Sequence, residues 1–191
     1  MTDALHQHIQ KFVSIPDDDM PGILACFTPL HLRKKENLLV EGNVCHSNYF
    51  VVKGCLRMFY INDKGDEQTI QFALENWWMA DYDSFSFQKP GLFSLQAVEQ
   101  SEVLALHYQA QEKLLQQYPA MERYYRLVHQ RAHAASQRRI RGQYNYSRED
   151  QYLHFARQYP EFVQRVPQYL LASFLGFTPE YLSEIRAKKR S

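Results

Sequence analysis

The sequence predicts an α+β fold that combines an N-terminal antiparallel β-roll of the jelly-roll kind, a long dimerisation helix and a C-terminal helix-turn-helix. Three observations support this prediction. Short apolar runs cut by Gly, Asn and Asp turns fill the first half of the chain. Residues 120–141 contain neither Gly nor Pro, and residues 166–186 have the spacing of two short helices joined by a glycine turn. The predicted domains are residues 1–119, 120–142 and 143–191.

The β-roll is predicted from six short runs with turn residues between them. Two short helices, at about Leu5–Val13 and Met20–Phe27, precede these runs, and Asp17–Asp19 is suited to cap the second helix. The clearest hairpin turn is Asn62–Gly65, because Asn, Asp and Gly tolerate positive φ. Strands and helices do not alternate here, which argues against a dinucleotide-binding fold. The predicted strands are residues 37–40, 48–52, 55–61, 67–74, 92–99 and 103–107.

The long helix carries apolar residues at alternating spacings of four and three, as in a two-stranded coiled coil. A shorter helix, Gln109–Gln117, precedes it. Small alanines on the stripe would let two helices approach closely, so the pattern predicts a homodimer. The alternative is that the stripe packs on the β-domain of its own chain. The predicted dimer seam is Met121, Tyr125, Val128, Ala132 and Ala135, and the helix is expected to end at Gly142.

Local signals in the last part of the chain predict three more helices. Ser147 is expected to cap a helix that runs to about Tyr159, and Pro167 to open the next one. Gly176 would end that helix, and Thr178 with Pro179 would begin another. Ala172 falls where the two helices cross. The apolar faces expected to pack there are Leu170, Leu171, Phe174 and Leu175 on one helix and Leu182 and Ile185 on the other.

The net charge of +1 conceals a strong asymmetry along the chain. Residues 1–110 contain 8 Lys/Arg and 14 Asp/Glu, whereas residues 111–191 contain 14 Lys/Arg and 7 Asp/Glu. This asymmetry suits a basic C-terminal part that binds a polyanion. No apolar run approaches the ~20 residues of a membrane span, and the N-terminus is polar, so a cytoplasmic protein is expected. Cys26, Cys45 and Cys55 lack the spacing of a metal site, which favours free thiols.

The order of these parts resembles the Crp/Fnr family of transcription regulators. The resemblance rests on Glu41-Gly42-Asn43, on the apolar run Tyr49–Gly54 and on Val166–Arg186. It implies a cyclic-nucleotide-binding-like sensor domain, a palindromic double-stranded DNA site, RNA polymerase as a partner and a small-molecule effector that the sequence does not identify. It also implies that Glu180 faces a base edge, accepting from a cytosine amine, and that Thr178 and Ser183 meet phosphates or nearby bases. The implied DNA-binding residues are Gln168, Thr178, Pro179, Glu180, Tyr181, Ser183, Glu184, Arg186, Lys188 and Lys189.

Two departures from the family pattern bear on function. The stretch that resembles the phosphate-binding cassette lacks its Gly, its Glu and its Arg, and Asp81 would repel a phosphodiester. Cyclic AMP is therefore not expected as a cofactor. The expected effector pocket is Trp77, Trp78, Asp81 and Ser94, although the aromatic residues of the roll could equally pack only on each other.

The second departure lies in the recognition helix, where Pro179 and Glu184 stand at positions that often carry Arg in the family. Guanine readout would then fall to Arg186 or to the basic tail at residues 188–190, with Arg148 and Arg165 as further phosphate contacts. The alternative is a sensor or scaffold that acts through protein contacts, with weak or lost DNA binding.

Neither an enzyme nor a metal site is expected. A cupin, which shares the β-roll, needs a His-x-His pair and a further Glu and His on its strands. The His-x-His pair of this chain, His6 and His8, precedes every predicted strand. His129 and His133 are spaced as helical metal ligands, but no third ligand is evident. We therefore predict no catalytic residue and no bound metal.

Overall fold

The computed structural model describes residues 1–188, which form two compact units. The first consists of Met1–Tyr60 and Gln71–His129, and the second of Ile61–Ile70 and the chain from Gln130 onward. Antiparallel sheets dominate the first unit and helices the second, which confirms the predicted α+β fold. The division falls at His129, inside the long helix, and not at residue 119 or 142. Among residues 1–188 no helix has both the length and the apolar character needed to cross a bilayer.

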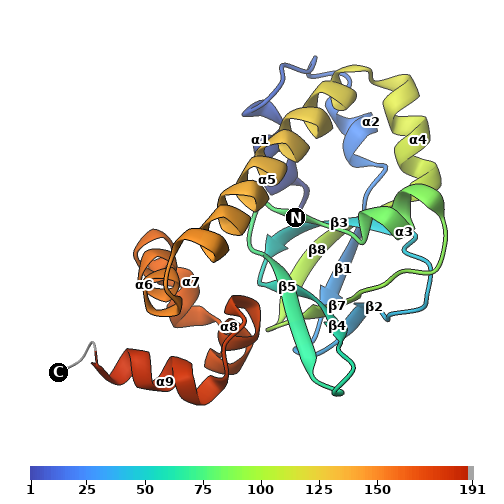
Figure 1. Cartoon of the computed structure of the whole chain (residues 1–191). Helices are drawn as coiled ribbons and strands as arrows, with labels where there is room; N and C mark the ends of the chain where they lie inside the picture. The colour runs from blue at the N-terminus through green and yellow to red at the C-terminus, as the bar shows by residue number, and fades with distance from the viewer. Residues whose placement is uncertain (189–191) are drawn as a thin grey trace. The chain divides into compact units, whose positions relative to one another are not determined.

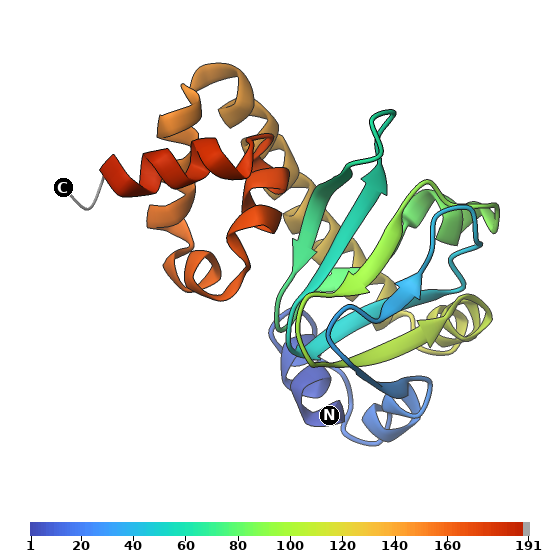
Figure 2. The same cartoon turned by 90° about the horizontal axis from the view of Figure 1, so that it is seen from below.

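Within residues 1–188, eight strands build two four-stranded antiparallel sheets, seen from below in Figure 2. One sheet has the order β1-β8-β3-β6 and the other the order β2-β7-β4-β5. All six predicted strands are present, whereas β1 and the two-residue β6 were not predicted. The strands are β1 (Thr28–Leu32), β2 (Asn37–Leu39), β3 (Ser47–Lys53), β4 (Leu56–Ile61), β5 (Glu67–Ala73), β6 (Trp78–Met79), β7 (Ser94–Ala97) and β8 (Ser101–His107).

The turn between β4 and β5 lies where the sequence predicts it. The Asn62 N–H donates to the carbonyl of Asp66 at 3.0 Å, and the Gly65 N–H donates to the carbonyl of Asn62 at 2.9 Å. The Asn62 side-chain oxygen accepts from the N–H groups of Lys64 and Asp66. The Asn side chain therefore closes the turn together with the backbone.

Helices of the first unit gather beside the strands of the first sheet (Figure 1). They are α1 (Thr2–Gln10), α2 (Met20–Leu24), α3 (Tyr82–Phe87), α4 (Tyr108–Gln117) and the first part of α5 (Ala120–Asn145). Asp19 stands at the N-cap position of α2, but its side chain makes no capping bond. Helix α3 was not predicted. The shared core includes Leu5, Ile9, Ile23, Phe50, Leu104, Leu106, Leu114, Met121 and Tyr124.

A buried hydrogen-bonded group lies inside this core. The Trp78 indole N–H donates to the Tyr124 hydroxyl at 2.9 Å, and the same hydroxyl lies 2.7 Å from Nδ1 of His8. Burial raises the pKa of Tyr124, so the hydroxyl stays protonated and keeps a proton to donate. The group joins α1, β6 and α5 by hydrogen bonds. Each of these buried polar groups would cost free energy if it were left without a partner.

The predicted dimer seam is corrected by the packing of α5. Met121 and Tyr125 are 0% and 6% exposed and belong to the core of their own unit, so they cannot also contact a second copy. Val128 is half-buried against the same core, whereas Ala132 and Ala135 are exposed. The open part of the stripe therefore begins near Val128. Helix α5 also continues through Gly142, its predicted end, as far as Asn145.

As far as Lys188, the second unit contains the rest of α5 and four further helices, which Figure 2 shows in orange to red. They are α6 (Arg148–Gln158), α7 (Pro160–Arg165), α8 (Gln168–Leu175) and α9 (Pro179–Lys188). Ser147 caps α6 as predicted, since its hydroxyl accepts from the N–H of Asp150 at 3.1 Å. Pro160 opens the unpredicted α7 instead of only ending α6. The buried residues are Tyr152, Phe162, Val163, Val166, Leu170, Leu171, Ala172, Phe177, Leu182 and Ile185.

Candidate functional site

The turn between α8 and α9 is defined by its backbone hydrogen bonds. Gly176 has φ of 75°, in the left-handed region that favours glycine. Its N–H donates to the carbonyl of Ser173, and the N–H of Phe177 donates to the carbonyl of Ala172. These paired bonds are those of a Schellman motif, which ends a helix and turns the chain. Gly176 therefore ends α8 as predicted.

Helix α9 begins with the predicted cap. The Thr178 hydroxyl accepts from the N–H of Tyr181 at 3.2 Å, and Pro179 is the first helical residue. Pro167, by contrast, is the N-cap of α8 and not its first residue. Ala172, Leu182 and Ile185 are 0–2% exposed, so α8 and α9 cross on a closely packed face as predicted. The two helices are thus joined by a short glycine turn and cross on this packed face.

The face of α9 that points away from this core is polar. Thr178, Pro179, Glu180, Ser183, Glu184 and Lys188 are exposed, and Tyr181 is half-buried. Tyr181 packs edge-on against Phe177, with ring centroids 5.6 Å apart. The structure thus brings most predicted DNA-contacting residues together on one helix. Lys189 and Arg190 lie outside the described residues.

Two further predicted residues contact each other at the helix crossing. An Arg186 guanidinium N–H donates to the side-chain oxygen of Gln168, and the Gln168 amide donates to the carbonyl of Pro179, both at 3.4 Å. Arg186 is half-buried. The pair therefore joins the start of α8 to α9. If either residue contacts a nucleic acid without rearrangement, it must do so while it keeps these hydrogen bonds.

Exposed arginines occur at the junction of α5 and α6. Arg138, Arg141 and Arg148 are all exposed. Arg139 is exposed as well, and its guanidinium lies 4.9 Å from the centre of the Phe174 ring. The second unit therefore combines the polar outer face of α9 with exposed cations.

The four predicted effector-pocket residues line neither of the two hollows described below. Trp78 is buried in the core beside Tyr124, whereas Trp77 is 47% exposed. Ser94 is buried and its hydroxyl accepts from the N–H of Glu41 at 3.0 Å. Trp78 and Ser94 therefore have packing or hydrogen-bonding roles of their own. An effector pocket formed by the four residues stays a prediction.

Asp81, the fourth of these residues, has a structural role. One carboxylate oxygen accepts from the N–H of Ser84 at 3.1 Å, which caps α3, and the other accepts from the N–H of Leu92 at 3.0 Å. Asp81 is 2% exposed, and Gly91 passes so close that a Cβ there would lie 2.6 Å from the carboxylate. The protein's own Asp81 carboxylate thus occupies the start of α3.

A cavity of about 200 Å³ opens elsewhere in the first unit, between β3, α3, α4 and α5. Asn48 lies at its wall and is 1% exposed, and the Tyr82 hydroxyl donates to its side-chain oxygen at 3.4 Å. Gln111 and His129 also line it. The sequence contained no motif for this cavity, because its residues come from four separate elements. The one available signal was that Gln111 and Glu112 fall within the predicted helix Gln109–Gln117, which Tyr108 directly precedes.

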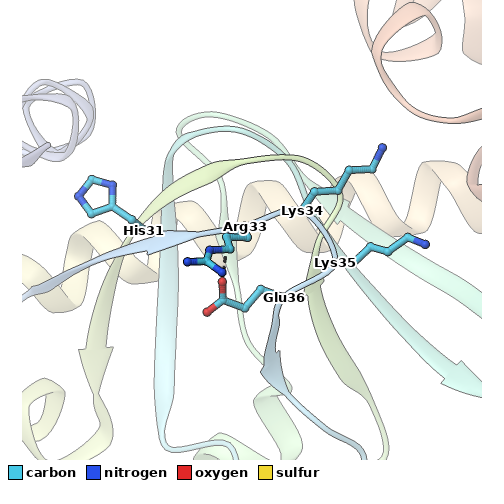
Figure 3. Close-up of a pocket in the computed structure, with 5 residues that line it drawn as sticks. All are labelled: His31, Arg33, Lys34, Lys35 and Glu36. Carbon is cyan, nitrogen blue, oxygen red and sulfur yellow. Dashed lines mark hydrogen bonds between the residues drawn. The ribbon is translucent and has the colours of Figure 1, made fainter.

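A basic turn between β1 and β2 lines the second hollow of the first unit. Figure 3 shows Lys34 and Lys35 on one side of it and His31 on the other. The N–H of Arg33 donates to the Glu36 carboxylate at 2.8 Å, the dashed line in the figure. All five lining residues are exposed, so a bound anion would stay in water. We assign no ligand to this hollow.

Comparison with known proteins agrees with the fold. Residues 29–118 match the family model of the cyclic nucleotide-binding domain. The match runs from β1 to the residue after α4 and leaves out α8 and α9. No curated protein sequence matches the chain significantly.

Solved structures of transcription regulators resemble the whole chain at low sequence identity. The global regulator CLP of Xanthomonas campestris, described as responsive to c-di-GMP, has a TM-score of 0.72 and 12% identity, over 92% of each chain. FixK2 of Bradyrhizobium japonicum has a TM-score of 0.67 and 16% identity, over 85% of this chain and 83% of its own. The catabolite activator protein of Thermus thermophilus has a TM-score of 0.57 and 18% identity, over 93% and 84%. At these identities the likeness is one of fold.

Proposed function

We propose that this protein is a homodimeric, sequence-specific DNA-binding transcription regulator of the Crp/Fnr type. One observation carries the proposal: α8 and α9 cross around a glycine turn, as the helices of a helix-turn-helix do, and the outer face of α9 is polar and exposed. In such motifs the second helix enters the major groove with its N-terminal residues at the base edges. The regulators of similar fold support this reading.

The charge distribution supports a polyanionic partner. The second half of the chain has an excess of basic residues, and exposed arginines lie near the helix-turn-helix. A dimer formed along α5 would present two recognition helices to a palindromic site. RNA polymerase remains a proposed further partner, on the resemblance alone.

Selection from randomised duplex DNA at two salt concentrations tests the proposal directly. We expect a palindromic site with half-sites about one helical turn apart. Binding should weaken steeply with salt, because phosphate contacts release counterions. If no site is recovered at either salt concentration, sequence-specific DNA binding is excluded under these conditions.

Variants of the recognition helix sharpen this selection. Glu180→Ala should relax the base preference at one position of each half-site, worth about 1–3 kcal/mol. Lys188→Ala combined with Lys189→Ala should weaken all sites alike and reduce the salt slope by about one per lysine. Glu122→Ala, at an exposed position of the first unit, serves as the control. It should change neither the base preference nor the salt slope. Identical profiles for all four proteins would overturn the placement of α9 in the groove.

We also propose that cyclic AMP is not the effector. The Asp81 carboxylate holds the N–H groups of Ser84 and Leu92, donors that an incoming phosphate would need. Its charge would also repel a phosphodiester. Repeating the selection with cyclic AMP present should recover the same site with the same salt slope. A change in affinity that depends on the nucleotide would contradict this part of the proposal.

A second candidate function has specific support. Two exposed glutamates, Glu180 and Glu184, lie on α9, and Arg186 is engaged with Gln168. These features would weaken attraction to DNA and favour a scaffold that works through protein contacts. The same selection separates the two functions, since a scaffold would recover no palindrome.

A further inference from the structure

The cavity between β3, α3, α4 and α5 has hydrogen-bond acceptors in its wall. The Gln111 side-chain oxygen is buried and has no hydrogen-bond partner among residues 1–188. The Asn48 oxygen receives one bond, the long one from Tyr82, and can accept a second. A buried acceptor without a partner costs free energy that a bound donor would recover. The cavity therefore suits a ligand that carries N–H or O–H groups.

The charges of the lining residues determine whether the cavity favours a cationic or an anionic ligand. Glu112 is the acidic residue that lines the cavity, and neither Lys nor Arg is among the described residues that line it. His129 lines it too, and burial lowers the pKa of this imidazole, which favours its neutral form. An anion would find no charge partner here, whereas a cation would face the Glu112 carboxylate.

Aromatic rings complete the wall. Tyr82 packs edge-on against His129 with ring centroids 4.9 Å apart, and Phe85 packs edge-on against Tyr108 at 5.6 Å. Aromatic faces attract ammonium groups and pack against methylene chains. The volume of about 200 Å³ lies below that of drug-sized sites, so only a small molecule fits.

We propose that this cavity binds a small aliphatic amine in its protonated form. The ammonium N–H groups would donate to the Glu112 carboxylate and to the Gln111 side-chain oxygen, and the methylene chain would lie against the rings of Phe85 and Tyr108. The site involves His129 on α5 but requires no DNA, so it stands or falls independently of the proposed regulator function.

Isothermal titration of the purified full chain with 1,4-diaminobutane tests the proposal. Two probes of the same chain length serve as comparisons, the neutral 1,4-butanediol and the anionic succinate, all at matched ionic strength. We expect saturable binding of one diamine per chain and no binding of the diol or of succinate. Equal binding of all three probes, or no binding of the diamine, would overturn the proposal.

Matched variants locate the bound amine. Glu112→Gln and Gln111→Met should each weaken diamine binding about tenfold, because the first removes the negative charge that faces the ammonium group and the second removes a hydrogen-bond acceptor. Glu122→Gln and Gln116→Met make the same changes at exposed positions that do not line the cavity, and they should bind like the unmodified protein. Circular dichroism checks that all four variants are folded. Diamine binding that Glu112→Gln and Gln111→Met leave unchanged would show that the amine binds elsewhere and would reject this site.

Discussion

Two neighbouring tyrosines in α5 differ in what their hydroxyls contact. The Tyr124 hydroxyl receives the Trp78 indole N–H and bonds with His8, whereas the buried Tyr125 hydroxyl has no partner among the described residues. Both rings belong to the same core. The side chains are identical, so replacing each by Phe isolates the effect of the hydroxyl group.

We expect Tyr124→Phe to lower the free energy of unfolding by about 1–3 kcal/mol, because it leaves a buried indole N–H without its acceptor. Tyr125→Phe should cost nothing measurable or stabilise slightly, since it removes a buried hydroxyl without a partner. Urea unfolding followed by tryptophan fluorescence reports on this unit, where both tryptophans lie. Equal losses in the two variants would show that ring packing, and not hydrogen bonding, determines the effect.

Replacing two glycines of the second unit by alanine should change stability in opposite directions. Gly176 ends α8 with φ of 75°, and a Cβ there would meet nothing within 4 Å. Gly142 lies within α5, and a Cβ there would meet Tyr146 at 3.5 Å, an ordinary contact. Alanine at position 176 would strain the backbone without a steric clash. Alanine at position 142 would only reduce the conformational freedom of the unfolded chain.

We therefore expect Gly176→Ala to destabilise the helix-turn-helix by about 1 kcal/mol, and Gly142→Ala to stabilise α5 by about 0.5 kcal/mol. Amide hydrogen exchange should show faster exchange in α8 and α9 for the first variant and slower exchange around residue 142 for the second. Exchange in α8 that Gly176→Ala leaves unaltered would contradict the role given to this turn.

The elements that local sequence signals specify were predicted well. Turn residues between β4 and β5 and the cap at Ser147 act through neighbours in the chain, so their spacing was sufficient. Helix α3 was missed although Asp81 caps it locally through the N–H of Ser84, and the same carboxylate also bonds Leu92 eleven residues later. Strand β1 begins with Thr28-Pro29 and depends on its pairing with β8. That pairing is a tertiary contact that no local pattern indicates.

The same distinction applies to the candidate site. The helix-turn-helix residues lie in one continuous segment, so their arrangement could be predicted. The cavity draws on residues from Asn48 to His129 that meet only in the fold. Met121 and Tyr125 followed a correct helical period, but that period does not say whether the stripe packs on its own domain or on a second copy.

At the scale of the whole molecule, the proposed dimer would use the exposed continuation of that stripe. We expect Ala132→Glu to raise the dimer dissociation constant at least about tenfold, because it places a bulky charge where two helices would meet. Gln137→Glu puts the same charge on the opposite face of α5 and should leave the dimer intact. Sedimentation over a range of protein concentrations measures both constants. A monomeric unmodified protein at every concentration would refute the dimer.

The Asp81 carboxylate has a consequence for how the roll could evolve or be engineered. Because it is tethered beside the amides it occupies, it acts as an intramolecular competitor, with an effective concentration of at least about millimolar. A free phosphate ligand present at micromolar levels would therefore have to bind these amides about a thousandfold more tightly than the carboxylate does in order to displace it. Opening this position to an external anion would thus require both removal of the carboxylate and a new donor for the helix end that it caps.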